Sequence, residues 1–388
     1  MFRIGKEEIE AVARVIEGKD FFKINETYQE SAHAEEDMQA LFGCEHALLM
    51  TSGHAALTSA LIAMGVGPGD EVIVPAYTYI ATAMAVVAAG AMPVIAEVDE
   101  TLTLSPIDAE KKITSHTKAI IPVHIQGFPC KMDAFMDLAN KYGLYILEDA
   151  CQADGGCYQG KRLGTWGKAG ALSFNYYKVI TSGEGGALLT NDKTVFERAL
   201  IYHDSSAVAF FGDQLSDVDT QSFCGNEYRT NDITAAILRE QLKKMDGILV
   251  DLRKNKSRLM EGLKDVCAFV PSNDLSGDCG TTLALLFDNA EKAAAVANAD
   301  GVNGIVPINT GKHIYRHWTP IMNKMGALNP LMDPFKMEAN KDIVPDYRDD
   351  MCPYTLDLLA RVVYIAIQPD WTEEELLSKI ECIKKAIL

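Results

Sequence analysis

Apolar residues recur along the chain with two periods. Helical spacing marks residues 6–17, where Ile9, Val12 and Val15 share a face, and a second helix is expected over 28–41. Farther on, short apolar strands alternate with helical segments. The expected strands are Glu71–Val74, Met92–Ala96, Ala119–Val123, Tyr145–Leu147 and Ala171–Phe174. The expected helices between them include Ala55–Met64, Ile80–Ala89 and Met132–Tyr142. This alternation predicts a largely parallel sheet covered by helices.

After about residue 250 the pattern predicts a smaller α/β unit. Two helices are expected across the transition, Asn231–Met245 and Asp251–Leu263. Beyond them, Thr281–Phe287 and Val302–Pro307 are expected strands, and Glu291–Ala299 and Thr372–Ile387 are expected helices. Thr372 and Glu375 form a capping box at the start of the last helix, and Pro307–Pro353 has the composition of long loops. We therefore expect a large domain over 1–250 and a smaller one over 251–388.

Composition limits the class of protein and of partner. A chain of 388 residues with 48% apolar and 23% charged residues is typical of a globular protein with a large and a small domain. Its formal net charge of -18 argues against nucleic acid and anionic membranes as main partners, although a local basic cluster could still hold an anionic substrate. No apolar run is long enough to span a membrane, and the N-terminal segment lacks the layout of a signal peptide. Nine scattered cysteines without a CxxC pair predict reduced thiols in the cytoplasm and no metal site.

Two short segments carry the candidate chemistry. The strand Tyr145–Leu147 leads directly into Asp149, and ligands of open parallel sheets bind outside such strand ends. Lys178 follows the next expected strand and precedes the glycine-rich Gly183–Gly186. Chemistry based on pyridoxal phosphate (PLP) needs an amine to hold the aldehyde and a carboxylate to keep the pyridine nitrogen protonated, which Lys178 and Asp149 could supply. Taken singly, such residues are usually a turn acid and a solvated lysine, so the inference depends on their order along the chain.

A third segment, Thr51–Leu57, places a small polar and glycine turn at the start of a helix. Free N–H groups and the helix dipole make such a turn suitable for a phosphate, and Ser173 could add a hydroxyl donor.

Together these motifs resemble the DegT/StrS-type sugar aminotransferases, which are PLP enzymes with the aspartate aminotransferase fold (fold type I). The resembling segments are Ile4–Glu8, Ser52–Leu57, Pro75–Thr82, Pro122–Gly127, Glu148–Ala153, Lys178 with Gly183–Gly186, Gly225–Arg229 and Ile233–Ile237. The resemblance implies an α/β large domain with a mostly parallel sheet, a smaller C-terminal α/β domain, and a homodimer with shared active sites.

The resemblance also implies roles for individual residues. Lys178 would be the Schiff-base lysine and move the proton, Asp149 would pair with the pyridine nitrogen, and Gln152 would touch the ring hydroxyl. Tyr79 would stack on the ring, unless it is a core tyrosine. The phosphate would be held by the turn and strand-end residues Ser52, Gly53, His54 and Ser173. A lysine at position 178, where some relatives carry histidine, favours transamination over dehydration.

Several positions depart from the family's usual residues. His54 replaces a threonine, Asp154 a histidine, and Glu227 an asparagine that meets the partner subunit's phosphate, so that Asn226 could take this role instead. Tyr176-Tyr177 and Tyr202-His203-Asp204 are also unusual. The last stretch and Asn226–Arg229 are similar to a subfamily that aminates C8 of an eight-carbon sugar acid, the 8-amino-3,8-dideoxy-octulosonate transaminases.

The expected reaction is ping-pong transfer of an amino group from glutamate or glutamine to a sugar carbonyl. Two acceptors are left open: a nucleotide-linked ketosugar and an 8-oxo octulosonate of lipopolysaccharide, with a ketocyclitol as a further alternative. Arg229 is a candidate for the donor carboxylate or for a structural ion pair. His313, Tyr315 and His317 are candidates for the acceptor pocket or for a plain surface loop. The rival function is a PLP-binding regulator without turnover.

Overall fold

The computed structural model describes residues 2–25, 27–206 and 218–388. Its centre is a seven-stranded sheet in the order β1-β9-β8-β5-β4-β2-β3. The strands are β1 (His46–Met50), β2 (Glu71–Pro75), β3 (Met92–Ala96), β4 (Thr117–Ile120), β5 (Tyr145–Asp149), β8 (Ala169–Ser173) and β9 (Gly186–Thr190). Strand β9 runs antiparallel to both neighbours, and the other pairs are parallel. The prediction of a mostly parallel sheet is confirmed.

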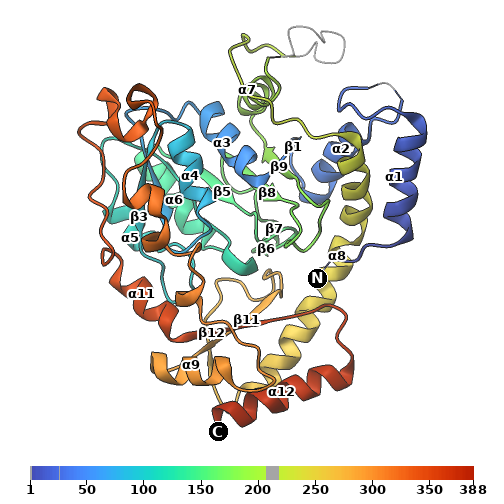
Figure 1. Ribbon diagram of the computed structural model, residues 1–388, viewed down its shortest axis with the longest axis vertical. Coiled ribbons are helices and arrows are strands. Elements are labelled where there is room, and N and C mark those ends of the chain that lie inside the picture. Colours follow the sequence, from blue (N-terminus) through green and yellow to red (C-terminus); the bar gives the residue numbers. More distant parts are fainter. Residues whose placement is uncertain (1, 26, 207–217) are drawn as a thin grey trace.

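Helices cover both faces of this sheet, because successive side chains of a strand point to opposite faces and apolar residues occupy both sets of positions. Leu49 and Ile73 belong to one buried cluster, whereas Leu48 and Val72 belong to the other. The first cluster is closed by α2 (Glu30–Phe42), α6 (Met132–Tyr142) and α8 (Asp232–Leu263). The second is closed by α3 (Gly53–Ala63), α4 (Ala81–Ala88) and α7 (Lys193–His203). The sheet therefore lies between two layers of helices (Figure 1).

The smaller C-terminal unit lies below this body in Figure 1. Its antiparallel sheet consists of β10 (Ala268–Phe269), β11 (Thr282–Leu286) and β12 (Val362–Ala366). The helices around it are α9 (Ala290–Asn298), α11 (Pro353–Ala360) and α12 (Glu373–Ile387). The predicted capping box at the start of α12 is confirmed, since Thr372 and Glu375 bond reciprocally. Minor elements are α5 (Pro106–Lys111), β6 (Cys157–Tyr158), β7 (Lys161–Arg162) and α10 (Thr319–Met322).

One continuous helix, α8, replaces the two helices predicted on either side of residues 246–250. The gap between the two predicted helices is also helical, and the buried Ile248 and Leu249 continue the apolar stripe through it. Residue 250 therefore lies inside a helix, and we keep the division into 1–250 and 251–388 as a proposal.

The predicted strand Val302–Pro307 is wrong. Only Ile305 forms an isolated bridge, to Tyr364, and Pro307 begins a short 3-10 helix because its ring leaves no N–H for a ladder. The expected loops of Pro307–Pro353 are confirmed, with short helical turns within them.

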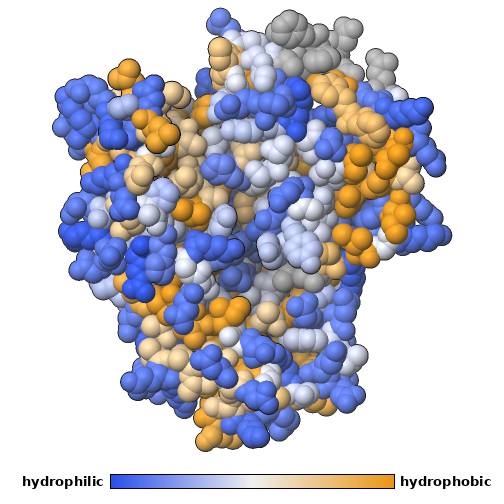
Figure 2. Space-filling view, in the orientation of Figure 1, coloured by the Kyte–Doolittle hydropathy of each residue, from blue (hydrophilic) through white to orange (hydrophobic). Residues whose placement is uncertain are grey.

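The N-terminal helix α1 (Lys6–Gly18) packs along α8 on the outside of the molecule (Figure 1). Apolar side chains gather over this region of the surface (Figure 2). The exposed ones are Ile4, Ile9, Ile16, Phe21 and Phe22. Among the helices of the described residues, none has the length and apolarity needed to cross a membrane.

Candidate active site

Two neighbouring parallel strands end at the candidate site. β5 ends at Asp149 and β8 ends at Ser173, with Asp149 paired in register with Ala171. Both ends lie at the carboxyl edge of the sheet, where the loops that follow the strands of an open sheet form binding crevices. Asp149 and the segment that leads to Lys178 are therefore neighbours in space, as their positions after two successive strands predicted.

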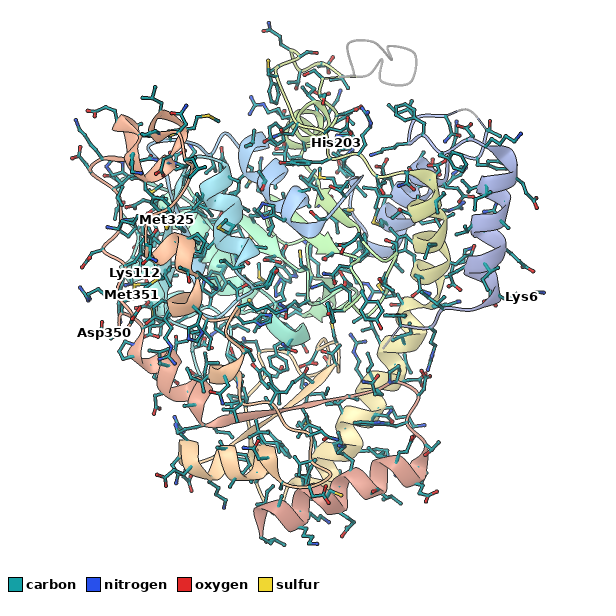
Figure 3. All side chains as sticks on the ribbon, in the orientation of Figure 1. Lys6, Lys112, His203, Met325, Asp350 and Met351 are labelled. Carbon is teal, nitrogen blue, oxygen red and sulfur yellow. The ribbon has the colours of Figure 1, made fainter. Side chains whose placement is uncertain are left out.

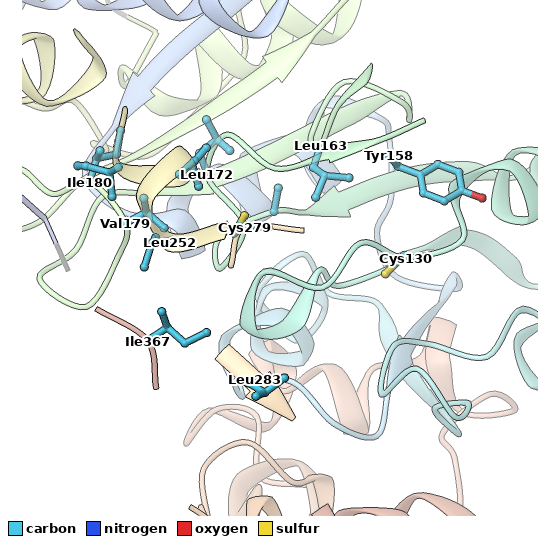
Figure 4. Close-up of a cluster of buried hydrophobic side chains, with 14 of the residues drawn as sticks. Cys130, Tyr158, Leu163, Leu172, Val179, Ile180, Leu252, Cys279, Leu283 and Ile367 are labelled. Atoms are coloured by element: carbon cyan, nitrogen blue, oxygen red, sulfur yellow. The ribbon is translucent and has the colours of Figure 1, made fainter. Parts of the chain in front are cut away.

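Lys178 lies in a closed loop beyond β8. Its N–H donates to the carbonyl oxygen of Asn175 at 3.1 Å, and Asn175 forms a bridge with Gly183 across the loop. The next two residues, Val179 and Ile180, are buried beside Leu252 in the core (Figure 4). Because these two apolar side chains anchor the loop, the lysine before them is presented to the strand ends.

Two adjoining cavities, of about 130 Å³ and about 360 Å³, meet at Lys178. The smaller one is lined by the predicted cofactor residues Ser52, Gly53, His54, Tyr79, Asp149, Gln152, Ser173 and Lys178. The larger one shares Lys178, Tyr79, Gln152 and Asn175 with it and extends toward the C-terminal unit through Thr281, Thr282 and His313. The structure therefore brings eight predicted residues to one place.

Asp149 is buried and held by hydrogen bonds to both oxygens. The hydroxyl of Thr82 donates to Oδ2 at 2.7 Å, and the backbone amide of Cys151 donates to Oδ1 at 3.1 Å. Its neighbour Glu148 instead accepts from His124 and from the backbone amides of residues 164, 166 and 167, and it lines neither cavity. Of the two acids, Asp149 alone therefore lines the site.

The turn before α3 has the geometry of an anion cradle. Ser52 caps the helix by accepting from the amide of Ala55, which leaves the first backbone amides of α3 for a ligand. A Cβ at Gly53 would come within 2.6 Å of Cys151 Sγ, so the close approach of this turn to β5 and β8 needs glycine. The ring of His54 donates a hydrogen bond from Nδ1 to the carbonyl oxygen of Ala81 at 3.3 Å.

Gln152 and Tyr79 lie where the two cavities join. The side-chain oxygen of Gln152 accepts from the amide of Gln126 at 3.1 Å, which leaves its amide hydrogens for the cavities. Tyr79 is 43% exposed, so it is not a core tyrosine. The centre of its ring lies 5.7 Å from the centre of the His313 ring. Burial and the charges of Lys312 and Lys178 lower the pKa of His313 to about 4, so its ring is neutral at physiological pH.

Four candidates lie outside these cavities. Asn226 donates to the hydroxyl of Tyr202 at 2.6 Å, and Arg229 forms ion pairs with Asp204 and Glu227. Tyr315 is buried and donates to the carbonyl of residue 349, and His317 is exposed beside the carbonyl of residue 311. Within one chain, the ion-pair alternative for Arg229 is the one observed. His313 alone among the three late-loop candidates reaches the larger cavity.

Further residues complete the larger cavity and were not predicted as site residues. They are Gln126, Asn175, Tyr177, Thr281, Thr282 and Lys312. Gln126 and Tyr177 lie in stretches that the sequence singled out without a role. Lys312 is brought to the site by antiparallel contacts between 77–80 and 312–314, and Thr281 and Thr282 by hydrogen bonds to Gln126.

Asp154, which the sequence marks only as unusual, lines the larger cavity with a fully buried side chain. Neither carboxyl oxygen has a hydrogen-bond partner among the described residues. Burial raises the pKa of this carboxyl well above its usual value; Lys178 and the nearby backbone of Ser173 oppose the rise, and Asp149 adds to it. Burial therefore favours the protonated, neutral form of Asp154.

Replacing Asp154 by asparagine is expected to stabilise the protein increasingly as pH rises. Below the unfolded pKa of about 3.9, aspartate is neutral in both states. Above it, the unfolded chain ionises while the buried acid stays neutral, which costs the wild type about 1.4 kcal/mol per pH unit until the folded pKa is reached. Thermal unfolding at about pH 5 and about pH 8, with exposed Asp300→Asn as the control, measures this. A difference that does not grow with pH would show that Asp154 is ionised in the fold.

Another cavity, of about 540 Å³, lies away from Lys178 near the end of α7, where Figure 3 labels His203. Its polar groups are paired with one another: Lys23 Nζ lies 2.8 Å from Glu35 and 3.2 Å from His203 Nε2. This cavity is larger than the two at Lys178, but it is not the candidate active site, because its buried lysine, Lys23, is already paired with Glu35. Among the described residues, no cluster of His, Cys, Asp and Glu could hold a metal ion.

The donor set at Lys178 fits pyridoxal phosphate. Gly53 lets the turn before α3 pack closely against Cys151 and Ser173, the first α3 amides and Ser173 suit the phosphate, and Asp149 and Lys178 line the same cavity. The roles of these residues stay proposals.

Comparison with known proteins gives a consistent result. Residues 3–297 match the DegT/DnrJ/EryC1/StrS aminotransferase family. The chain is 41% identical over 206 residues to GDP-perosamine synthase of Escherichia coli O157:H7, covering 53% of this chain and 55% of that protein. It is 36% identical over 264 residues to the spore coat polysaccharide biosynthesis protein SpsC of Bacillus subtilis (strain 168), covering 66% of this chain and 65% of that protein. The matches thus span between about half and two thirds of these relatives.

Solved structures extend the likeness over the whole chain. The structure of 3-amino-5-hydroxybenzoic acid synthase superposes with a TM-score of 0.80 at 26% identity, covering 100% of this chain and 98% of that one. The fold predicted from the sequence, fold type I of the PLP-dependent aminotransferases, is confirmed.

Proposed function

The chain belongs to the DegT/DnrJ/EryC1/StrS aminotransferase family, a family of PLP-dependent sugar aminotransferases, and on that premise we propose that it transfers an amino group from an amino acid to a sugar carbonyl. The cofactor predicted from the sequence, PLP, is confirmed by this membership. The observation that carries the proposed activity is the shared cavity of Lys178 and Asp149.

When bound, PLP supplies an aldehyde for amine exchange and a ring that accepts electrons. In our proposal Asp149, fixed by Thr82 and Cys151, keeps a negative charge at the ring nitrogen. Lys178 Nζ accepts the Cα proton of the donor and later returns a proton to the aminated carbon of the sugar. Ser52, the N-cap of α3, the first α3 amides at Gly53 and His54, and the hydroxyl of Ser173 hold the phosphate. Gln152 contacts the ring hydroxyl, and Tyr79 covers the ring.

For the acceptor we propose a nucleotide-linked ketosugar. GDP-perosamine synthase, which is 41% identical over the matched part, supports this class by its name. The 8-oxo octulosonate and a ketocyclitol are alternative outcomes of the same assay, since no described contact favours either.

Two measurements on the purified protein test the function. Adding glutamate or glutamine is expected to bleach the visible absorbance of covalently bound PLP, because the amino group stays on the cofactor. Adding nucleoside-diphosphate ketosugars, the oxidised octulosonate or a ketocyclitol in turn is expected to restore it with one acceptor class, with an amino sugar detected by mass spectrometry. Absorbance that neither amino acid changes would favour the rival, a PLP-binding regulator without turnover.

We also propose a homodimer with shared active sites, acting in the cytoplasm. Asn226 and Arg229 lie outside their own chain's cavities, and exposed apolar side chains gather near α1, which supports an interface there. All nine cysteines are free thiols, which supports a reducing compartment. Sedimentation at micromolar concentration tests the dimer.

A further inference from the structure

Hydrogen bonds to the main chain of its loop hold Lys312 at the larger cavity. Its carbonyl oxygen accepts from the amide of Ile80 at 3.3 Å and from the indole N–H of the buried Trp318 at 3.1 Å. The carbonyl of the next residue, His313, accepts from the amide of Thr78 at 3.0 Å. These bonds fix the main chain of the late loop against the segment that carries Tyr79.

The ammonium of Lys312 lies over two tyrosine rings of the cavity. Its Nζ is 5.5 Å from the ring centre of Tyr79 and 5.9 Å from that of Tyr177. In the described ranges, no carboxylate lies within 4.0 Å of this nitrogen. Cation–π contacts at exposed sites contribute only about 0.5–1 kcal/mol, so they orient the ammonium without neutralising it.

The charge balance of the cavity is positive. Among the described residues, the charged or titratable side chains that line it are Lys178, Lys312, His313, Asp154 and the two tyrosines. Burial favours the neutral forms of both His313 and Asp154. Because the proposed function commits the amine of Lys178 to the cofactor, Lys312 is the cation that this cavity offers to an anion, in a chain whose formal charge is -18.

A second, independent observation indicates that a ligand completes this cavity. Asp154 is fully buried, lines the cavity, and has no hydrogen-bond partner on either oxygen in the part of the chain that the structure describes. Leaving a buried polar group unsatisfied is destabilising, and a ligand oxygen that accepts a hydrogen bond from the protonated carboxyl would remove this penalty. The cavity therefore combines the ammonium of Lys312 with a buried carboxyl group that has no hydrogen-bond partner among the described residues.

We propose that the larger cavity is an oxyanion subsite in which Lys312 supplies the positive charge, and that it binds a carboxylate or a phosphate of one of the two substrates. This inference rests on the proposed function, because both substrates of that reaction are anions: the amino acid carries carboxylates and the nucleotide sugar carries a diphosphate. It assigns to Lys312 the recognition role that the sequence suggested for Arg229, whose guanidinium is paired with Asp204 and Glu227.

The test separates the two half-reactions on the cofactor-loaded protein. Lys312→Met keeps the length of the side chain and removes the charge, Lys312→Arg restores it, and Lys118→Met is the matched control. Lys118 also lies over a tyrosine ring, 5.7 Å from the centre of Tyr145, but outside both cavities. The apparent dissociation constant is measured for glutamate in the first half-reaction and for the nucleotide ketosugar in the second, at low and high salt.

For Lys312→Met we expect the dissociation constant of one substrate to rise about tenfold or more, with a smaller change in the maximal rate and a weaker dependence on salt. Lys312→Arg is expected to recover most of the affinity, and Lys118→Met to behave as wild type. A rise in the first half-reaction identifies the donor carboxylate as the occupant, and a rise in the second identifies the phosphate. An unchanged visible spectrum of bound PLP shows that the cofactor site is intact.

The inference is overturned if Lys312→Met leaves both dissociation constants within about twofold of the wild type. A wild type that turns over neither substrate would instead defeat the proposed function. In that case, calorimetric titration of the cofactor-loaded wild type and Lys312→Met with glutamate and with GDP still decides the inference. Binding of neither ligand to the wild type, or equal binding to both proteins, overturns it.

Discussion

Lys178→Ala is expected to lose amino transfer by a factor of at least about 10³ and to lose covalent attachment of PLP. The reason is that one side chain supplies both the amine that bonds to the cofactor and the base that moves the proton, and proton transfer alone contributes about 10²–10⁴-fold. Borohydride reduction followed by peptide mass spectrometry is expected to place the added cofactor mass on Lys178 in the wild type and nowhere in the variant.

The control for this change is Lys161→Ala, which removes an exposed lysine that lies over Trp166 and lines neither cavity. It is expected to keep both the activity and the labelled peptide. Turnover by Lys178→Ala above about one hundredth of the wild-type rate, or labelling of another lysine in the wild type, would remove Lys178 from the role proposed here.

Asp149→Asn is expected to reduce turnover by about 10²-fold or more while the fold persists. Asparagine keeps the shape, and its single oxygen can still accept from the amide of Cys151 while its NH2 group donates to the hydroxyl of Thr82, but it loses the negative charge that we assign to the ring nitrogen. The change should act on the chemical step, so single-turnover rates with glutamate are the measurement. The visible spectrum of bound PLP is expected to shift as well, because the protonation of its ring changes.

Thr82→Val provides the graded comparison for Asp149. It keeps the charge of the carboxylate and removes the 2.7 Å hydrogen bond to Oδ2, so we expect a loss nearer tenfold. If Asp149→Asn were no slower than Thr82→Val, the charge of Asp149 would not matter to the reaction, and another acid would have to be sought.

The site residues that the sequence predicted are those that directly follow an expected strand or open an expected helix. Asp149 and Lys178 each follow a strand, and parallel strands deliver their ends to one edge, so their proximity follows from topology. Gly53 was marked by the turn that opens α3. The cofactor cavity contains all of these residues together with Ser173 and Gln152.

The missed residues depend on contacts between segments far apart in the sequence. Lys312 reaches Tyr79 because the loop at 312–314 pairs with 77–80, a contact across more than half the chain that no motif encodes. Asp154 departs from the family's usual residue, but no sequence pattern predicted that its side chain is fully buried near Lys178 and the backbone of Ser173. Strands β1 and β9 escaped prediction as elements, and their antiparallel pairing carries Gly186 against the Ser52 backbone.

Helix α8 spans 32 residues, or about 48 Å, and belongs to the core of both parts of the chain. Leu238 and Leu242 near its start are buried in the same cluster as Leu259 and Leu263 near its end, and that cluster also contains Ile380 and Ile383 of α12. A partial loss of either part would leave half of this apolar stripe in water. The two parts therefore form one cooperative folding unit. Neither the seven-stranded sheet nor the C-terminal unit could be exchanged for a homologous segment unless the half of α8 that packs against it were exchanged as well.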